Sequence, residues 1–410
     1  MAYLIYIITF VSLYLAVVWL SFLYLSEFSD KKKLTRFPTV TIAIPAYNEA
    51  STITKSIKSI INLNYPKDKL EIIVINDYSK DKTKEIVEKI IKKNNQVCIK
   101  LINKKNNQGK AHALNSAIDI ASGEIFGCLD SDSYADKNSL RLLIPHLFNP
   151  KTAAVISSIK VINQKSLLGK VQRMEYFMVT LTRKLMSVID TLYTTPGVLS
   201  IYKTKILKKL GGFDTNCLTE DFEIAMRLRH NHYNVKMEPE SITYTKVPED
   251  PKLFWRQRIR WTRGFIENNV KYKKMYFNSK YGLLGWFQLP LSVVAPTLLI
   301  VGMLFIGYNI LKTLYKLITR VVLIDGYLNS LFVFPPLKRI FLSQNFRIAF
   351  PLLVASLLGF TLLYLAHKQA KEKIKYPASI LAYYLLLHYV MAAYWISAIT
   401  QEIFKTKKKW

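Results

Sequence analysis

Apolar and polar residues follow two different patterns along the 410 residues of this chain. Between residue 36 and about residue 265, short apolar runs alternate with amphipathic stretches. A buried strand is predicted for residues 40–45 (VTIAIP), and Ile53, Ile57 and Ile60 then recur at spacings of four and three, as on one face of a helix. Strands that alternate with amphipathic helices predict an α/β domain with a mostly parallel sheet.

The same alternation continues through the rest of this region. Further strands are expected at residues 71–77, 99–102, 125–130, 153–156 and 198–202, with a long helix over 167–188. In open α/β sheets, ligands gather at the carboxyl ends of the strands. Polar residues follow three of the predicted strands: Tyr47-Asn48-Glu49, Asp77, and Asp130-Ser131-Asp132. We therefore expect these side chains to meet at one edge of the sheet.

Long uncharged runs form the second pattern. Residues 2–26 hold no charged side chain, and the same is true of 281–311, 348–366 and, with a neutral His388, 376–400. At about 1.5 Å per residue, each run is long enough to cross a hydrocarbon core of about 30 Å. The basic residues Lys31–Lys33 follow the first run instead of preceding it, which favours an uncleaved anchor over a cleavable signal peptide.

These patterns divide the chain into three predicted parts. Residues 1–30 form an amino-terminal transmembrane anchor, 36–265 a cytoplasmic domain, and 266–410 interfacial segments with three to four transmembrane helices. Residues 321–336, which contain Asp325, are interpreted as an interfacial or re-entrant piece. The expected location is a multi-pass position in the cell membrane, although basic loops on both sides of the last span leave its orientation open.

The charge balance suits a membrane surface. The chain has 58 Lys and Arg against 28 Asp and Glu, a net charge of +30. Basic residues occur throughout and no nucleic-acid-binding motif accompanies them, so anionic lipid is favoured as the partner over nucleic acid. The three cysteines are isolated, which argues against a disulfide framework or a zinc site.

The scarce acidic residues are concentrated in motifs that carry chemistry. Asp130 and Asp132 follow a buried strand, where two carboxylates could hold Mg²⁺ or Mn²⁺, cations that prefer hard oxygen ligands. Asp221, in Thr219-Glu220-Asp221, precedes a helical run and suits a general base; an ordinary helix cap is the alternative. In the pentad Gln257–Trp261 (QRIRW), Gln257 shares a helix face with Arg260 or Trp261. Such a helix could bind diphosphate through arginine, and it could equally anchor the protein at a lipid surface.

Together these motifs resemble the processive, membrane-integrated glycosyltransferases of family 2: the poly-N-acetylglucosamine, hyaluronan, chitin and cellulose synthases. The likeness covers residues 38–265. The matching pieces, in order, are Pro45–Glu49 (PAYNE), Asn76-Asp77, Gln108–Ala111 (QGKA) with Leu114-Asn115, Asp130–Asp132 (DSD), Thr219–Asp221 (TED) and Gln257–Trp261. Pro196-Gly197 departs from the family pattern, because relatives often have Ser-Gly there.

The resemblance implies a GT-A-type domain, a UDP-sugar donor and a Mg²⁺ or Mn²⁺ cofactor. It also implies roles for individual residues. On the donor side, Tyr47, Glu49 and Asp77 would contact the uridine, Lys110 the nucleotide and Arg260 the diphosphate, while Asp130 would lie near the ribose, the diphosphate and the metal that Asp132 binds. Asp221 would be the general base of an inverting transfer, and Glu220, Gln257 and Trp261 would contact the acceptor. N-acetylglucosamine is the favoured sugar, on the likeness to the poly-N-acetylglucosamine synthases.

Three functions remain to be compared. The leading hypothesis is polysaccharide synthesis with export of the chain, in which an accessory membrane subunit would fit. The alternative is transfer of a single sugar to a glycolipid acceptor, as in ceramide glucosyltransferases or polyprenyl-phosphate glycosyltransferases. A non-catalytic scaffold is the third, and the intact set of acidic and basic residues argues against it.

Overall fold

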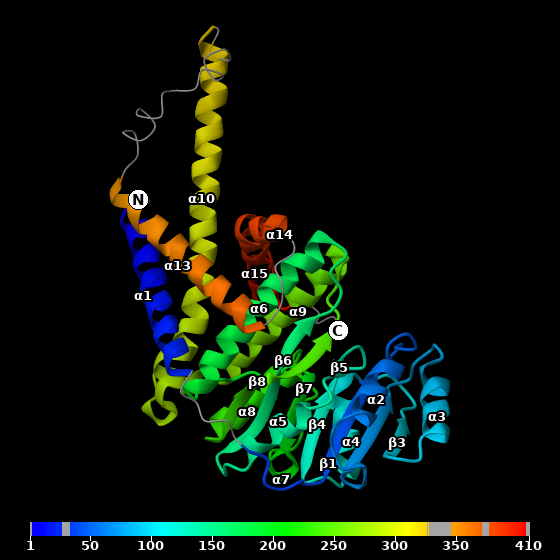
Figure 1. Cartoon of the computed structure of the whole chain (residues 1–410). Coiled ribbons are helices and arrows are strands. Elements are labelled where there is room, and N and C mark those ends of the chain that lie inside the picture. The colour runs from blue at the N-terminus through cyan, green and yellow to red at the C-terminus, as the bar shows by residue number, and fades with distance from the viewer. Residues whose placement is uncertain (1, 27–32, 326, 328–345, 371–376, 407–410) are drawn as a thin grey trace.

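The computed structural model describes residues 2–26, 33–325, 327, 346–370 and 377–406 (Figure 1). Lys31, Lys32 and most of the interfacial piece predicted at 321–336 lie outside the described residues. A mixed sheet carries a layer of helices on each face, and the apolar helices gather at one end of it.

The sheet has eight strands in the order β3-β2-β1-β4-β7-β6-β8-β5. Strands β1 to β4 are mutually parallel, as predicted, whereas β7 runs antiparallel to both of its neighbours. Strand β6 is parallel to β8, and the short β5 is antiparallel to it. Their bounds are β1 Val40–Ala46, β2 Leu70–Asn76, β3 Cys98–Asn103, β4 Ile125–Leu129, β5 Tyr134–Ala135, β6 Thr152–Val161, β7 Val198–Lys203 and β8 Asn234–Thr245. The α/β class with a mostly parallel sheet is confirmed.

Strands β5 and β8 were not anticipated from the sequence. The second half of β8 buries Ser241, Thr243 and Thr245, so its alternation is not one of apolar and polar residues. Two of these hydroxyls have hydrogen-bond partners: Thr243 bonds to Ser157, and Thr245 accepts from the Ser133 hydroxyl. A strand that buries hydrogen-bonded hydroxyls shows no alternation of apolar and polar residues, so a hydrophobicity pattern does not predict it.

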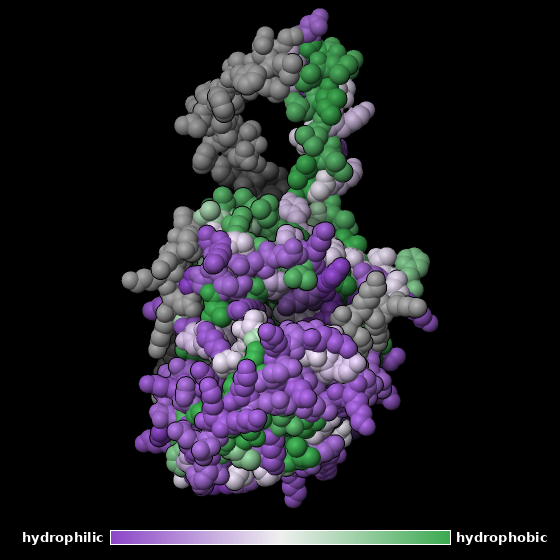
Figure 2. Space-filling view, turned by 90° about the vertical axis from the view of Figure 1, so that its right-hand side faces the viewer, coloured by the Kyte–Doolittle hydropathy of each residue, from purple (hydrophilic) through white to green (hydrophobic). Residues whose placement is uncertain are grey.

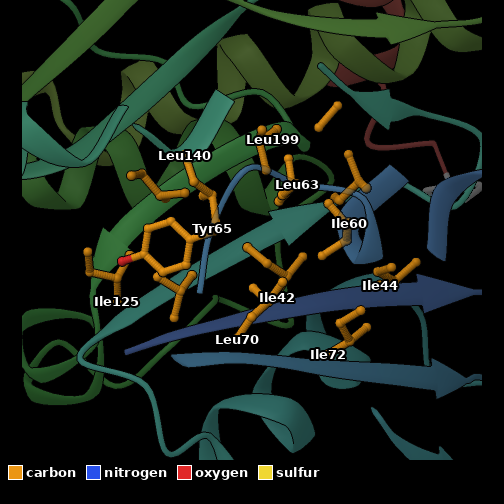
Figure 3. Close-up of a cluster of buried hydrophobic side chains, with 14 of the residues drawn as sticks. Ile42, Ile44, Ile60, Leu63, Tyr65, Leu70, Ile72, Ile125, Leu140 and Leu199 are labelled. Atoms are coloured by element: carbon orange, nitrogen blue, oxygen red, sulfur yellow. The ribbon is translucent and has the colours of Figure 1, made fainter. Parts of the chain in front are cut away.

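Successive side chains of a strand point to opposite faces of the sheet, so each strand contributes side chains to two hydrophobic cores, one on each face. Figure 3 shows the first core, where Ile42, Ile44 and Ile72 of the strands meet Ile60. Helices α2 (Ile53–Ile61), α3 (Thr83–Lys93) and α5 (Ser139–Leu147) cover this face, with the one-turn η1 (Lys67–Lys69) between α2 and β2. Helices α4 (Lys110–Ile120), α7 (Thr204–Lys209) and α8 (Glu220–His230) cover the other face.

Two long helices connect the sheet to the apolar helices. Helix α6 (Leu167–Val188) buries Met174 and Leu181 against α13 (Phe346–Ala370) and α1 (Ala2–Ser26), which lie side by side in Figure 1. Helix α9 (Pro251–Lys271) packs on α15 (His388–Ile403), which α14 (Pro377–Ala382) and η5 (Tyr383–Leu387) precede. The helix predicted at 167–188 is thus confirmed.

Helices occupy all four of the uncharged runs. Among the described residues, two continuous helical stretches are long and apolar enough to cross a membrane, judged by length and composition: Leu284–Leu323, which comprises η4 (Leu284–Gln288) and α10 (Leu289–Leu323), and Ala378–Ile403. The short turns η2 (Lys273–Met275) and η3 (Ser279–Tyr281) lead into α10 from α9. Helix α10 projects from the body, and its apolar side chains, such as Leu311 and Val322, are exposed (Figures 1 and 2). The number and orientation of membrane spans stay predictions.

Candidate active site

Parallel pairing of β2, β1 and β4 brings three of the predicted sequence motifs to one edge of the sheet. The loops that follow β1 and β2 are joined directly. The Asn48 backbone N–H donates to Ser79 Oγ over 3.0 Å, and the Lys80 N–H donates to Asn48 Oδ1 over 2.8 Å. Asn48 and Tyr78 have left-handed backbones (φ 56° and 64°), a conformation that is uncommon outside glycine and is enriched at functional sites. Tyr47 and Tyr78 are exposed at this edge.

Asp77 is buried and organises the loop that precedes α4. Its two carboxylate oxygens accept the backbone N–H groups of Gln108, at 3.1 Å, and Gly109, at 2.8 Å. Gly109 has a φ of 88°, which favours glycine, and Lys110 is the next residue and the first of α4. Asp77 therefore positions Lys110, and its predicted contact with uridine stays a prediction.

Lys110 links two of the acidic motifs. Its Nζ lies 2.5 Å from Asp130 Oδ1 and 3.2 Å from Glu220 Oε1. Burial alone would lower the pKa of Lys110, but the negative charges of Asp130, Glu220 and Asp221 raise it well above its ordinary value. The ammonium therefore stays charged. It interacts both with Asp130 at the end of β4 and with Glu220 at the start of α8, so the two motifs belong to one charged cluster.

Gly197, in the loop before β7, makes room for this ion pair. A Cβ at this position would lie 2.7 Å from Asp130 Oδ1 and would collide with the Lys110 ammonium. The Asp130 N–H also donates to the Gly197 carbonyl over 3.1 Å. The sequence marked Pro196-Gly197 only as a departure from the family pattern. Its contribution to the site was missed because the contact spans 67 residues of sequence, from 130 to 197.

Asp132 carries uncompensated negative charge. Its pKa is raised to about 6, chiefly by burial and also by the carboxylates of Asp130 and Glu49, while the Ser133 hydroxyl and Lys110 act in the opposite direction. Ser133 Oγ donates to Asp132 Oδ1 over 3.0 Å, while Glu49 accepts a short hydrogen bond from the Thr52 hydroxyl. Such an environment favours a bound cation.

The residues fit a divalent cation of the Mg²⁺ or Mn²⁺ type. Within the described ranges, no group of three or more acidic, histidine or cysteine side chains could enclose an ion by itself. Mg²⁺ is commonly held by one or two carboxylates while substrate phosphates and water supply the remaining oxygens. Asp132, with Asp130 close enough for its charge to act on it, matches that donor set.

Glu220 and Asp221 begin α8, where the helix amino terminus meets the cluster. Asp221 is partly buried, and its Oδ1 accepts the Phe222 N–H over 2.8 Å. The pKa of Asp221 is raised to about 6, first by burial and then by the charge of Glu220, against the opposing charges of Lys110 and Arg260. Thr219 occupies the cap position but makes no side-chain capping bond, and Glu220 pairs with Lys110, so this motif is more than an ordinary cap.

Helix α9 brings the pentad against α8 through a close contact. A Cβ at Gly264 would lie 2.9 Å from the Cβ of Thr219, so only glycine allows this approach. Asn268 Nδ2 donates to Thr219 Oγ1 over 3.3 Å and reinforces it. Arg260 donates to the Leu218 carbonyl over 3.4 Å, and its charge acts on Asp221. Arg260 thus lies beside the acidic cluster, and its predicted contact with the diphosphate stays a prediction.

Arg258 fixes the remainder of the pentad. It is buried and forms two hydrogen bonds, of 2.8 and 2.7 Å, with the Glu175 carboxylate of α6. Its guanidinium lies 4.9 Å from the ring centroid of Trp261, a cation–π contact that orients the indole. Gln257 is partly exposed on the same helix. Glu175 was missed, since nothing near it in the sequence forms a motif.

Comparison with known proteins agrees with this arrangement. Residues 41–211 match the family described as glycosyl transferase family 2. The poly-beta-1,6-N-acetyl-D-glucosamine synthase of Staphylococcus epidermidis is 34% identical over 245 residues, which are 58% of this chain and 58% of that protein. The chain thus spans a little over half the length of that synthase. A Bacillus subtilis protein named "Probable glycosyltransferase YdaM" is 29% identical over 338 residues, 78% of this chain and 80% of that protein.

The fold is also known. The mannosyltransferase PcManGT of Pyrobaculum calidifontis, solved in complex with GDP-Man and Mn²⁺, matches with a TM-score of 0.65 and 18% identity, over 98% of this chain and 99% of that one. The GT-A fold is confirmed, and the resemblance to family 2 synthases is confirmed as a similarity. Over residues 41–211 the chain is thus similar to family 2 glycosyltransferases.

Proposed function

We propose that the protein transfers a sugar, with UDP-N-acetylglucosamine as the favoured donor, to a growing polysaccharide, and that it forms β-linkages at the cytoplasmic face of a membrane. The observation that carries the proposal is the single cluster formed by Lys110, Asp130, Asp132, Asp221 and Arg260. It combines cations for a diphosphate, carboxylates for a metal and a carboxylate of raised pKa. The similarity to a poly-N-acetylglucosamine synthase supports the donor and product.

The donor is held by residues at the strand ends. Tyr47, Glu49 and Asp77 would contact the uridine, and Arg260 with Lys110 would hold the diphosphate, since guanidinium groups bind phosphate oxygens in bidentate fashion. Asp132 and Asp130 would bind Mg²⁺ or Mn²⁺, which supplies Lewis-acid neutralisation of the leaving diphosphate. The Mn²⁺ in the PcManGT complex supports a cation of this class.

Asp221 is the proposed general base. A pKa of about 6 leaves it ionised at neutral pH yet basic enough to accept a proton from the acceptor hydroxyl. Attack of that oxygen on the anomeric carbon, opposite the leaving diphosphate, inverts the configuration. Trp261, Gln257 and Glu220 are the proposed acceptor-side residues, although Glu220 also holds Lys110.

One observation favours a second function, transfer of a single sugar to a lipid acceptor. Helices α6 and α9, which contribute Glu175 and Arg260 beside the site, pack directly on the apolar helices α1, α13 and α15. A lipid-borne hydroxyl or phosphate could thus approach the site along these helices. Export of a polymer would instead need a polar path through the membrane part.

Product size separates the two functions. The purified chain in lipid nanodiscs is supplied with radiolabelled UDP-N-acetylglucosamine and Mn²⁺, and the products are resolved on a gel and by lipid extraction. A ladder of water-soluble polymer supports the proposal, and a single organic-soluble product replaces it with lipid glycosylation. Absence of any transfer from UDP-sugars, with transfer from another nucleotide sugar, would contradict the donor assignment.

A further inference from the structure

The segment that connects α6 to β7 contacts the first turn of α8. Thr195, which is fully buried in this segment, donates its hydroxyl to the backbone carbonyl of Asp221 over 2.6 Å. Two residues later, Gly197 lies against Lys110 and Asp130. One short stretch of chain therefore contacts both the residue proposed as the base and the ion pair of the same cluster.

The peptide unit between Asp221 and Phe222 links this hydrogen bond to the carboxylate. Its carbonyl oxygen accepts from Thr195, and its N–H donates to Asp221 Oδ1 over 2.8 Å. Because a peptide unit is planar, the orientation of the oxygen also sets the orientation of the N–H. The Thr195 hydroxyl thus acts on the carboxylate through one rigid group. Hydrogen bonds in such a series also polarise one another, which strengthens the N–H as a donor.

The first turn of α8 is held from outside the helix. Side-chain caps commonly bond to the free N–H groups of a first helical turn and fix its position. Thr219, at the cap position of α8, makes no such bond, and its hydroxyl instead accepts from Asn268 of α9. Glu220 is fixed by Lys110, and Thr195 holds the next peptide. The position of Asp221 therefore depends on these contacts with other elements.

We propose that Thr195 is the positioning residue for Asp221 in the sugar transfer, because its hydroxyl holds the peptide unit whose N–H orients the carboxylate. The inference rests on the proposed role of Asp221 as the base. Thr195 acts through the backbone of Asp221 and takes no part in the proton transfer itself. A base must lie within hydrogen-bond reach of the proton that it accepts, so a small rotation of this peptide slows the chemical step and spares donor binding.

Kinetics of the full chain in lipid nanodiscs test this role. Thr195→Val removes the hydroxyl with little change in shape, and Thr195→Ser keeps it. The fold should tolerate the valine, because the Asp221 carbonyl also lies in α8 and accepts the helical hydrogen bond from four residues further on. Thr191→Val is the matched control. Thr191 is equally buried in the same connecting segment, and its hydroxyl also donates to a backbone carbonyl, that of Met186 in α6.

Thr195→Val is expected to lower kcat about tenfold, while KM for the UDP-sugar and the affinity for UDP stay within about twofold of the wild type. Thr195→Ser should recover most of the rate, and Thr191→Val should match the wild type. In the Asp221→Asn background, Thr195→Val should slow single-turnover transfer by no more than about twofold, because the carboxylate through which it acts is already absent.

Hydrogen–deuterium exchange gives a second readout that needs no turnover. The backbone amides of residues 219–226 should exchange faster in Thr195→Val than in the wild type or in Thr191→Val, since the first turn of α8 has lost one of its anchors. Thr195→Ser should restore the slower exchange. This measurement reports on the position of the turn whether or not the sugar is transferred.

Several results would overturn the inference. They are a wild-type kcat or unchanged exchange in Thr195→Val, a loss of UDP affinity that parallels the loss of kcat, an equal loss in Thr191→Val, and an undiminished effect of Thr195→Val in the Asp221→Asn background. Each of these refutes the positioning role alone when Asp221→Asn shows its expected defect. Transfer by Asp221→Asn at the wild-type rate would instead refute the proposed base, and the positioning role with it.

Discussion

The Lys110 ammonium and the Asp130 carboxylate meet at 2.5 Å across a space that stays open only because residue 197 has no side chain. This contact joins a helix amino terminus, a strand end and a loop into one site. The geometry therefore depends on a glycine that takes no part in the chemistry itself.

Gly197→Ala should damage the site without unfolding the domain. The new methyl group must displace the Lys110 ammonium and the Asp130 carboxylate, so we expect kcat/KM for the donor to fall at least tenfold. Steady-state kinetics with varied UDP-sugar measure it. Gly307→Ala in α10 is the matched control, because a Cβ there meets no atom within 4 Å. Wild-type kinetics for Gly197→Ala would contradict the role of the open space.

Activity should decline as the pH falls through about 6. The pKa of Asp221 is raised to about 6 by burial and by Glu220, and a general base must be ionised to accept a proton. Asp132 has a similarly raised pKa, so a second protonation steepens the acid limb wherever the metal is not saturating. The pH profile of kcat/KM at low and at saturating Mn²⁺ measures both. An acid limb centred near pH 4 would exclude Asp221 as the titrating base.

The same pKa shift predicts that Asp221→Asn stabilises the protein above pH 6. The folded state disfavours the ionised carboxylate, so the wild type loses stability as the pH rises from about 4, the unfolded pKa, through about 6. The amide avoids that loss, and the gain at pH 7 should be about 1 to 3 kcal/mol and vanish near pH 4. Thermal unfolding at both pH values measures it; a variant no more stable than the wild type at pH 7 would refute the buried-charge argument.

Helix α9 should transmit changes in α15 to the site. Buried Arg263 pairs with Glu402 at 2.5 Å and donates to the Thr406 carbonyl at 2.9 Å, one turn away from Arg260. Arg263→Gln and Glu402→Gln should each lower kcat severalfold and melting temperature together, because each leaves a charge of the pair unmatched.

A double-mutant cycle checks the coupling. The two changes should be non-additive by about 0.5 to 3 kcal/mol, as expected for residues in direct contact. Additive effects would show that Arg263 and Glu402 act independently. Lys405→Gln, an exposed change near the same helix end, is the control and should be silent.

Much of the fold could be predicted from the sequence because its elements are locally encoded. The apolar runs of β1, β2 and β4 and the periodic helix α6 appear where the pattern placed them. The antiparallel direction of β7 could not be predicted, since periodicity reports which faces are buried and not which way a strand runs. Strand β8 was missed because it buries the hydroxyls of Ser241 and Thr243 in place of apolar side chains.

The candidate site residues likewise divide into those that the sequence indicates and those that only the structure reveals. Asp130, Asp132, Asp221 and Arg260 stand in short motifs, so they could be proposed as site residues from the sequence alone. Gly197 and Glu175 act through contacts with residues far away in the chain, and no local signal distinguishes them from ordinary turn or helix residues. Their roles follow only from the packing of α6, α8 and α9.

The most direct test of the central claim, that Asp221 is the base of a metal-dependent transfer, is a single-turnover measurement with radiolabelled UDP-sugar. Wild type, Asp221→Asn and wild type with excess chelator are compared, with UDP affinity recorded in parallel. We predict that Asp221→Asn binds UDP as the wild type does but transfers at least a thousandfold more slowly, and that chelator stops transfer. Transfer by Asp221→Asn at the wild-type rate, or unchanged transfer in chelator, would contradict it.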